Sequence, residues 1–238
     1  MLKNKKILAI IPARGGSRRL PGKNIRKLLG KPLIVWTIEQ AKKSKYIDKL
    51  IVSTDDKAIA EISKKYGAEV IKRPKILAID RAKTIDVIFH LLSVLKKEKY
   101  DPEIIVLLQP TSPLRTVKDI DNAIELFLKN KCESVISIYE SGHSPYWSFK
   151  IGKKYLEPIF SRKYLKQMRQ DLPRAYIPNG AIYISRPKVL LKYKSFYCKK
   201  ILPYIMPAVR SIDIDNETDF KLAELLLKKQ NEKNKNKG

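Results

Sequence analysis

Two groups of residues in this sequence have the types and spacing that binding of a polyphosphate and a divalent metal ion requires. The first is a loop of small and basic residues that directly follows an apolar stretch. Small residues let backbone N–H groups approach phosphate oxygens, while Arg14 and Lys23 add positive charge. The candidate nucleotide contacts in this loop are Ala13, Arg14, Gly15, Gly16, Ser17, Lys23 and Asn24.

The loop belongs to neither of the two common phosphate-binding motifs. Five residues, not four, separate Gly16 from Gly22. Asn24 stands where a Walker A motif has the Ser or Thr that binds magnesium, and a dinucleotide GxGxxG pattern is absent. A basic surface loop is the alternative, but two further arginines, Arg18 and Arg19, and a Pro-Gly turn favour phosphate binding.

The second group is the carboxylate pair Asp213 and Asp215. Residues 212–215 are expected to form a short strand, on which positions two apart project from the same side. Two like charges on one side repel unless a cation lies between them, and ligation by oxygen alone favours Mg²⁺ over Zn²⁺, with Mn²⁺ also possible. Alternatively, Asp215 caps the final helix and Asp213 is solvated.

Three other segments carry polar side chains that suit a hydroxyl-rich ligand. Residues 109–115 (QPTSPLR) offer an amide, two hydroxyls and a guanidinium, although an ordinary proline-rich connection is an equal alternative. Residues 179–183 (NGAIY) place an amide and a phenol beside a strand, and Arg169 lies in an irregular stretch. His90 is expected in the core, and His143 is uninformative.

The elements that must position these residues alternate between strand and helix. Apolar strands are expected at 6–12, 49–54, 68–72, 104–108, 134–139, 180–185 and 212–215. Helices are expected at 32–43, 56–66, 84–97, 117–128 and 217–228. This order predicts an α/β fold, a three-layer α/β/α sandwich around a mostly parallel sheet, with ligands at the carboxyl ends of the strands. Residues 1–238 form one domain in this interpretation, with an inserted arm at about 140–177 and a disordered basic tail at about 230–238.

Composition limits the function classes. The chain has 238 residues, 44% of them hydrophobic, which excludes global disorder. No apolar run reaches the roughly 20 residues of a membrane span, and no signal peptide is recognised, so a cytoplasmic protein without membrane partners is expected. Two cysteines without a CxxC pattern exclude a disulfide scaffold or a cysteine zinc site.

The net charge of +26 has two interpretations. One is a basic nucleic-acid-binding protein, although no helix-turn-helix, zinc-finger or RNP-like signature supports it. The other is a general drift toward lysine on helix faces, combined with a small functional cluster in the loops. From the residues alone, that cluster consists of Arg14, Arg18, Arg19 and Lys23 in the first loop.

Taken in order, six segments resemble the acylneuraminate cytidylyltransferases, also called CMP-sialic acid synthetases. They are residues 11–24, 73–80, 109–115, 169–173, 179–183 and 213–215. The resemblance implies a nucleotide-diphospho-sugar transferase fold and a homodimer whose arms help to close the partner's sugar pocket. It also implies transfer of CMP from CTP to an acidic nine-carbon α-keto acid sugar, with Mg²⁺.

The resemblance also implies roles for individual residues. Arg14 and Lys23 would hold the triphosphate and act as catalytic residues together with the metal ligands Asp213 and Asp215. The nucleoside side would be lined by Asn24, Arg73, Asp80 and Thr84. The substrate-binding residues would be Gln109, Thr111, Ser112, Arg115, Arg169, Asn179 and Tyr183, with Arg169 reaching the sugar acid from either chain.

Three departures from the family pattern bear on the substrates. Ile177 replaces an arginine of some members, Arg81 and Lys83 replace small hydroxyl residues, and residues 143–147 (HSPYW) are aromatic where relatives have a lysine. These departures favour a sugar other than N-acetylneuraminate, such as a di-N-acetylated, legionaminate-like acid. An octulosonate sugar or GTP is the alternative.

Overall fold

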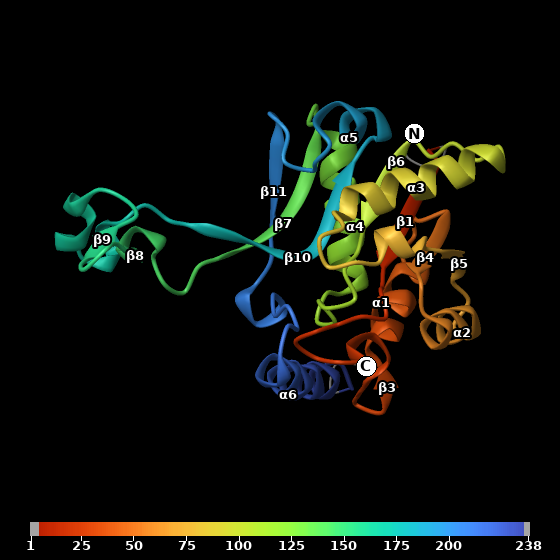
Figure 1. Cartoon of the computed structure of the whole chain (residues 1–238), viewed down its shortest axis with the longest axis horizontal. Coiled ribbons are helices and arrows are strands. Elements are labelled where there is room, and N and C mark those ends of the chain that lie inside the picture. The colour runs from red at the N-terminus through yellow and green to blue at the C-terminus, as the bar shows by residue number, and fades with distance from the viewer. Residues whose placement is uncertain (1–4, 236–238) are drawn as a thin grey trace.

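A seven-stranded sheet with the strand order β11-β7-β10-β6-β1-β4-β5 runs through the body of the protein (Figure 1). The structure is a computed structural model that describes residues 5–235. The strands are β1 (Ile7–Pro12), β4 (Lys49–Thr54), β5 (Glu69–Lys72), β6 (Ile104–Leu107), β7 (Ser134–Glu140), β10 (Tyr176–Ser185) and β11 (Ile201–Ile205). The chain therefore places β1 in the interior of the sheet, between the central strand β6 and β4.

The sheet is mostly parallel, as the sequence predicted. β1 pairs in parallel with both β4 and β6, β4 with β5, and β11 with β7. Within the described residues, β10 alone runs against its neighbours β6 and β7. The carboxyl ends of β1, β4, β5 and β6 thus meet at one edge, where the polar loops follow them.

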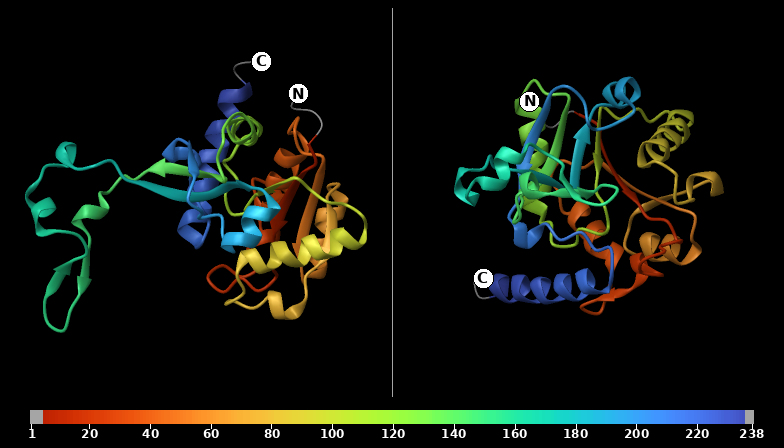
Figure 2. Two further views of the ribbon diagram at one scale, coloured as in Figure 1. Left: turned by 90° about the horizontal axis from the view of Figure 1, so that it is seen from above. Right: turned by 60° about the vertical axis from the view of Figure 1, so that its left-hand side comes forward.

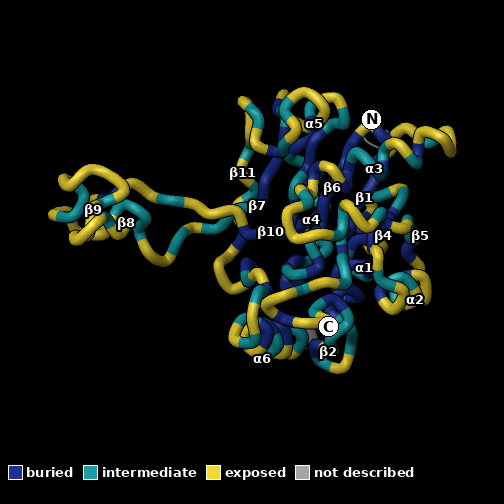
Figure 3. Tube along the Cα trace, viewed as in Figure 1, coloured by how far each residue is buried: buried dark blue, intermediate teal, exposed yellow. Residues whose placement is uncertain are grey.

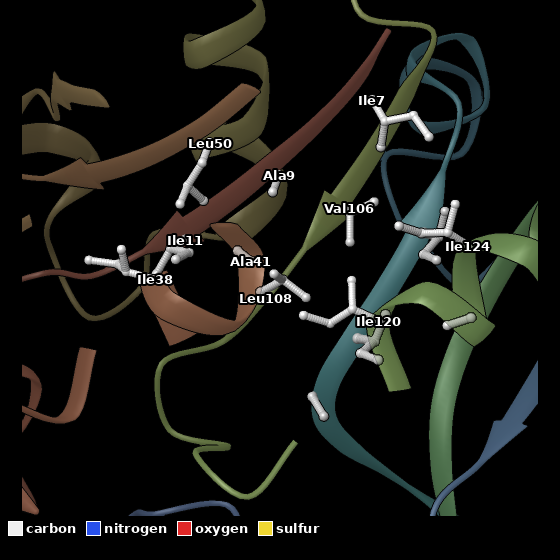
Figure 4. Packing of buried hydrophobic residues seen from close by; sticks show 14 of the residues in the cluster. Ile7, Ala9, Ile11, Ile38, Ala41, Leu50, Val106, Leu108, Ile120 and Ile124 are labelled. Atoms are coloured by element: carbon white, nitrogen blue, oxygen red, sulfur yellow. The ribbon is translucent and has the colours of Figure 1, made fainter. Parts of the chain in front are cut away.

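Helices cover both faces of the sheet, because alternate β1 residues point to opposite sides. Ala9 and Ile11 pack on the side of α1 (Leu33–Lys42), α2 (Lys57–Lys65) and α4 (Val117–Lys129). Leu8 and Ile10 pack on the side of α3 (Thr84–Lys97) and α5 (Pro187–Tyr193). Figure 4 shows the first of these clusters, with apolar side chains filling the space between sheet and helices. The three-layer sandwich is confirmed.

Polar residues fix where two of these helices begin. The Asp56 side chain accepts a hydrogen bond from the backbone N–H of Ile59 and caps α2. Thr116 and Asp119 form a reciprocal capping box at the start of α4. Each cap satisfies N–H groups that have no partner within the helix, and loss of one typically costs about 1 kcal/mol.

The carboxyl-terminal helix α6 (Glu217–Lys235) packs below the sheet on the hairpin of β2 (Lys27–Leu28) and β3 (Lys31–Pro32). Leu28, Leu114, Ile214, Phe220 and Leu227 are buried in this third cluster. It anchors Ile214, which stands between the two candidate metal ligands, against the loop that follows β6.

Several predicted elements need correction. Residues 212–215 form no strand, since the Ile214 N–H donates to the Thr111 carbonyl of a loop instead of joining the sheet. The sequence did not predict β11 or α5. The tail prediction is wrong for residues 230–235, which continue α6 because Lys, Gln and Glu favour helix and no Gly or Pro interrupts them. Residues 236–238 lie outside the described part.

The predicted insertion is a projecting arm, here defined as residues 141–175. It leaves the body after β7 and returns into β10, and it carries the short hairpin of β8 (Phe149–Ile151) and β9 (Leu156–Pro158) (Figures 1 and 2). Tyr146 packs against Phe160 and Tyr164, with ring centroids 5.0 Å and 4.6 Å apart. Most of the arm is exposed or only partly buried (Figure 3).

Two further observations complete the fold. Among the described residues, no helix combines the length and the apolar character that crossing a membrane requires. Cys132 is buried and Cys198 is partly buried, and both are free thiols.

Candidate active site

A cavity of about 600 Å³ opens at the edge of the sheet where the parallel strands end. Its walls come from the loop after β1, the segment between β5 and α3, the loop after β6 and the residues before α6. The predicted site residues that line it are Arg14, Ser17, Lys23, Asn24, Arg73, Asp80, Thr84, Gln109, Thr111, Asp213 and Asp215. Four loops far apart in the sequence therefore converge on one space.

The loop after β1, here called the basic loop (residues 13–24), is fixed by contacts to β4. The backbone N–H of Ala13 donates to the Ser53 carbonyl at 2.9 Å, and that of Gly15 donates to the Asp55 carboxylate at 3.1 Å. A Cβ at Gly15 would lie 2.9 Å from side-chain atoms of Asp56, so only glycine fits this approach. Ala13, Gly15 and Gly16 do not line the cavity with side chains, but they shape the loop that does.

Four cations of the basic loop line the cavity, and they already have counter-ions. Arg19 lies 2.9 Å from one Asp215 oxygen, and Lys23 lies 3.4 Å from the other. Arg14 lies 2.7 Å from an Asp80 oxygen, and Arg18 pairs with the second Asp80 oxygen. The cavity is therefore basic overall, and Asp80 and Asp215 each bridge two of its cations.

Arg73, at the end of β5, is the most buried cation of the cavity wall. Its guanidinium donates to the Ser53 carbonyl at 2.8 Å and to the Ser53 hydroxyl at 3.3 Å. Burial lowers the pKa of Arg73 to about 10; Asp55 opposes this shift and Arg14 adds to it. Arg73 still carries its charge at neutral pH and faces the cavity from a fixed position.

Asp213 and Asp215 both line the cavity on either side of the buried Ile214. Asp213 opens into the cavity, but the surrounding protein partly removes it from bulk water, and this burial raises its pKa. The nearby Asp215 raises the pKa further, while Thr111 and Lys23 act in the opposite direction. A cation close to both carboxylates would relieve this destabilisation of the charged form.

The donor set fits a hard divalent cation. The two aspartates provide oxygen ligands only, and the described residues contain no group of three or more His, Cys, Asp or Glu side chains that could hold a metal. Mg²⁺ is commonly bound by one or two carboxylates, with phosphates and water completing its coordination. The remaining ligands would therefore come from a bound nucleotide and solvent.

Three predicted substrate contacts lie in the protein interior and do not line the cavity. Ser112 donates to the Asn179 carbonyl, and the Asn179 side chain bonds to Ser137 and Ser211. Arg115 is fully buried and donates to the carbonyls of Ala181 and Gln109 and to the Thr37 hydroxyl. The bonds from Ser112 and Arg115 to β10 backbone carbonyls hold the loop after β6 against β10.

Two other predicted contacts lie away from the cavity in this chain. Tyr183 is partly buried on β10, with its ring centroid 5.5 Å from that of Phe196, and burial raises its pKa. Arg169 is exposed in the arm. The sequence analysis also missed the apolar wall formed by Leu77, Ile79, Ala82 and Val87. Apolar residues give no signal in sequence that separates a cavity wall from the core.

Gly180 occupies a position that requires glycine. Its φ is +74°, it lies at a register shift in the pairing of β10 with β7, and a Cβ there would be 2.4 Å from the Gln109 amide oxygen. Gly180→Ala is expected to lower the free energy of unfolding by about 1–3 kcal/mol, because it adds backbone strain and displaces Gln109 from the cavity wall. Urea denaturation measures this loss. Gly142→Ala, with no atom near the added Cβ, is the matched control, and equal stability of the two variants would contradict the assignment.

The fold and this cavity define a nucleotidyltransferase-like α/β protein with a basic cleft at the carboxyl ends of its parallel strands. A sequence profile of the family described as Cytidylyltransferase matches residues 8–236. The chain belongs to this cytidylyltransferase family.

Three curated relatives are 32–38% identical to this chain over the aligned residues. An N-acylneuraminate cytidylyltransferase of Escherichia coli O18:K1:H7 is 38% identical over 95% of this chain but only 53% of its own length. The chain thus spans about half of that relative. A CMP-N,N′-diacetyllegionaminic acid synthase of Legionella pneumophila is 38% identical, over 93% of this chain and 96% of that protein. A pseudaminic acid cytidylyltransferase of Campylobacter jejuni is 32% identical, over 95% and 98%.

Solved structures share the fold. A CMP:2-keto-3-deoxy-manno-octonic acid synthetase complexed with CTP superimposes with a TM-score of 0.70 at 20% identity, over 94% of this chain and 99% of that one. A 4-diphosphocytidyl-2C-methyl-D-erythritol synthase from Anaerococcus prevotii gives a TM-score of 0.61 at 18% identity, over 94% and 96%. At these identities the likeness concerns the fold alone.

Proposed function

We propose that the protein transfers CMP from CTP to the anomeric hydroxyl of an acidic nine-carbon α-keto acid sugar. The hydroxyl oxygen attacks the α-phosphorus and forms a new O–P bond, the bond from the α-phosphorus to the bridging oxygen breaks, and pyrophosphate leaves. The hydroxyl proton passes to solvent. The products are a CMP-sugar and pyrophosphate.

The observation that carries this proposal is the meeting of five cations and three aspartates in one cavity. Arg14, Arg18, Arg19 and Lys23 come from the basic loop, and Arg73 follows β5. Asp80 lies between β5 and α3, and Asp213 and Asp215 lie before α6. Binding of a triphosphate needs such a concentration of fixed positive charge. Among common substrates, a nucleoside triphosphate with an acidic acceptor suits this charge best.

The residues of the basic loop have distinct tasks in the proposed reaction. Arg14 and Lys23 bind phosphate oxygens and stabilise the charge that develops as pyrophosphate departs. Asn24 is buried, and its side-chain amide donates to the Arg14 carbonyl at 3.0 Å, so it orients Arg14. Asp213 and Asp215 would hold a divalent metal ion, which we propose is Mg²⁺, and which when bound stabilises phosphate charge and lowers the pKa of the attacking hydroxyl.

We expect a di-N-acetylated, legionaminate-like acid to be the preferred sugar. The departures at Ile177 and at residues 143–147 favour it over N-acetylneuraminate, and the Legionella relative is similar over nearly its full length. Gln109 and Thr111 are the polar groups on the cavity wall that would contact the sugar. Tyr183 and Arg169 do not line this cavity, so they would contact the sugar only if it extended beyond the cavity or if a second chain contributed them.

A two-way substrate screen tests this function. Purified protein with Mg²⁺ is incubated with CTP or GTP and with sialic, legionaminic, pseudaminic or octulosonic acid, and pyrophosphate and the nucleotide-sugar are measured. Turnover is expected with CTP and at least one nonulosonic acid. Absence of turnover with every combination would refute the function, and turnover with GTP alone would refute the choice of base.

We also propose that the protein acts as a homodimer through its arm. The arm exposes large apolar side chains, with Ile151 87%, Tyr155 72%, Leu156 61% and Met168 65% exposed. Apolar surface of this kind is typical of a protein interface. Arg169 lies in the same arm and away from its own cavity, so a partner's cavity is the place where it can meet the sugar acid.

Complementation between two inactive variants tests the shared site. Arg14→Ala is defective in the body and Arg169→Ala in the arm. A mixed dimer then contains one site with an intact body and an intact arm. Random mixing after dissociation should restore about one quarter of the wild-type sites. Activity of the mixture equal to the mean of the two separate variants would show that each site uses its own arm.

A further inference from the structure

Asp80 makes the polar link between two walls of the cavity. It lies in the segment that joins β5 to α3, here called the β5–α3 segment (residues 73–83). One carboxylate oxygen lies 2.7 Å from Arg14, and the other pairs with Arg18. In the described part of the chain, the β5–α3 segment and the basic loop make no polar contact other than these two ion pairs.

Arg73 anchors the start of the β5–α3 segment through its hydrogen bonds to Ser53, but the residues after it have few contacts that fix them in place. Its backbone hydrogen bonds around Asp80 are local turns, such as Leu77 to Pro74 and Ala82 to Ile79. Ile76 is 74% exposed and Ile79 is 55% exposed, so neither is anchored in the core. Asp80 therefore ties the part of this segment that follows Arg73 to the basic loop.

The ion pairs of Asp80 compete with the triphosphate that Arg14 and Arg18 are proposed to bind. Arg14 cannot give the same donor atoms to a carboxylate and to a triphosphate. A carboxylate beside several phosphate oxygens would also be repelled by their charge. The two ion pairs must consequently be exchanged when a polyphosphate binds.

We propose that Asp80 is an internal counter-anion: it pairs with Arg14 and Arg18, and an incoming triphosphate displaces it from them and releases the part of the β5–α3 segment around Asp80. This inference rests on the proposed function, since it takes a nucleoside triphosphate as the ligand. It gives Asp80 a positioning role in place of the nucleoside contact expected from the family resemblance. Asp80 thereby lowers the affinity for polyphosphate.

The two roles for Asp80 predict opposite effects of Asp80→Asn. As a counter-anion, its neutralisation frees Arg14 and Arg18, so inorganic tripolyphosphate and CTP should both bind about 3- to 10-fold tighter. As a nucleoside contact, its neutralisation should weaken CTP and leave tripolyphosphate unchanged. Isothermal titration calorimetry with both ligands, without divalent metal and at constant ionic strength, measures the two affinities.

Glu125→Gln provides the matched control for charge. Glu125 pairs with Lys45 and Lys129 on the surface of α4, away from the cavity, and its neutralisation raises the net charge by the same amount. Wild-type affinity for tripolyphosphate is expected in this variant. If both variants tighten binding equally, or if Asp80→Asn binds tripolyphosphate no more tightly than wild type, the counter-anion role is wrong.

The outcome also separates this inference from the proposed function. Wild-type protein that binds CTP and produces a CMP-sugar, while Asp80→Asn gains no affinity, refutes the counter-anion role only. Tighter tripolyphosphate binding by Asp80→Asn, in a protein that forms no nucleotide-sugar, refutes the function only. Faster hydrogen exchange in residues 75–82 of the Asp80→Asn variant is the additional result expected from release of the segment.

Discussion

Asp213→Asn is expected to lower kcat by about 10³-fold while the protein stays folded. The amide keeps the size of the side chain but removes the negative charge that a divalent cation requires. Burial already raises the pKa of Asp213, so the folded chain has little to lose when this carboxylate is neutralised. Asp215→Asn should likewise lose most activity, and it also removes the counter-ion of Arg19 and Lys23.

Steady-state kinetics with CTP and the accepted sugar measure the loss, and Mn²⁺ binding followed by electron paramagnetic resonance measures the metal site directly. Asp101→Asn is the control, because Asp101 is exposed in the loop before β6, at the opposite edge of the sheet. A near-normal kcat or an unchanged Mn²⁺ affinity in Asp213→Asn would show that the metal lies elsewhere.

Arg14→Ala is the second change with a large expected effect, a loss of about 10²–10³-fold in kcat. Arg14 is a preorganised donor: its carbonyl is held by Asn24, and its loop is fixed to β4 through Ala13 and Gly15. Once Arg14 has exchanged Asp80 for the triphosphate, a donor whose backbone is held in this way stabilises charge in the transition state without further rearrangement of its loop. Removal of the side chain should therefore affect kcat more than stability, which circular dichroism during thermal denaturation monitors.

The conservative variant Arg14→Lys separates charge from geometry. A lysine keeps the positive charge but lacks the planar pair of donors that fits a phosphate group. Activity between those of wild type and Arg14→Ala is expected. Equal kcat for wild type and Arg14→Ala would contradict a role in the transition state, and a change in KM alone would assign Arg14 to ground-state binding.

Local patterns accounted for most of the secondary structure. The helix over Thr84–Lys97 coincides with its prediction, and the apolar strands β1, β4 and β6 match within a residue at each end, because burial on both faces demands continuous apolar side chains. Residues 212–215 failed as a strand for a non-local reason. Whether such a segment joins a sheet depends on a free strand edge, and here Ile214 packs on α6 and bonds to the loop after β6.

The candidate site was predicted best for residues whose location follows from the topology of a parallel sheet. Loops that follow parallel strands meet at one edge of the sheet, so Arg14, Arg73 and Gln109 could be placed together before the structure was known. Ser112 and Arg115 show where this reasoning ends. Sequence alone does not distinguish a buried arginine that donates to backbone carbonyls from one that binds a ligand. For Arg115, the distinction comes from its contacts with Ala181 and Thr37 in the folded protein.

The sequence alone determined the α/β class, the basic loop and the aspartate pair, because each depends on residue types at short spacing. The tertiary structure decided which polar side chains reach the cavity, and it revealed that Asp80 and Asp215 form ion pairs with the four cations of the basic loop. These ion pairs join residues that are far apart in the chain. The physical reason is that only packing brings such residues together, and no local pattern encodes which charges will meet.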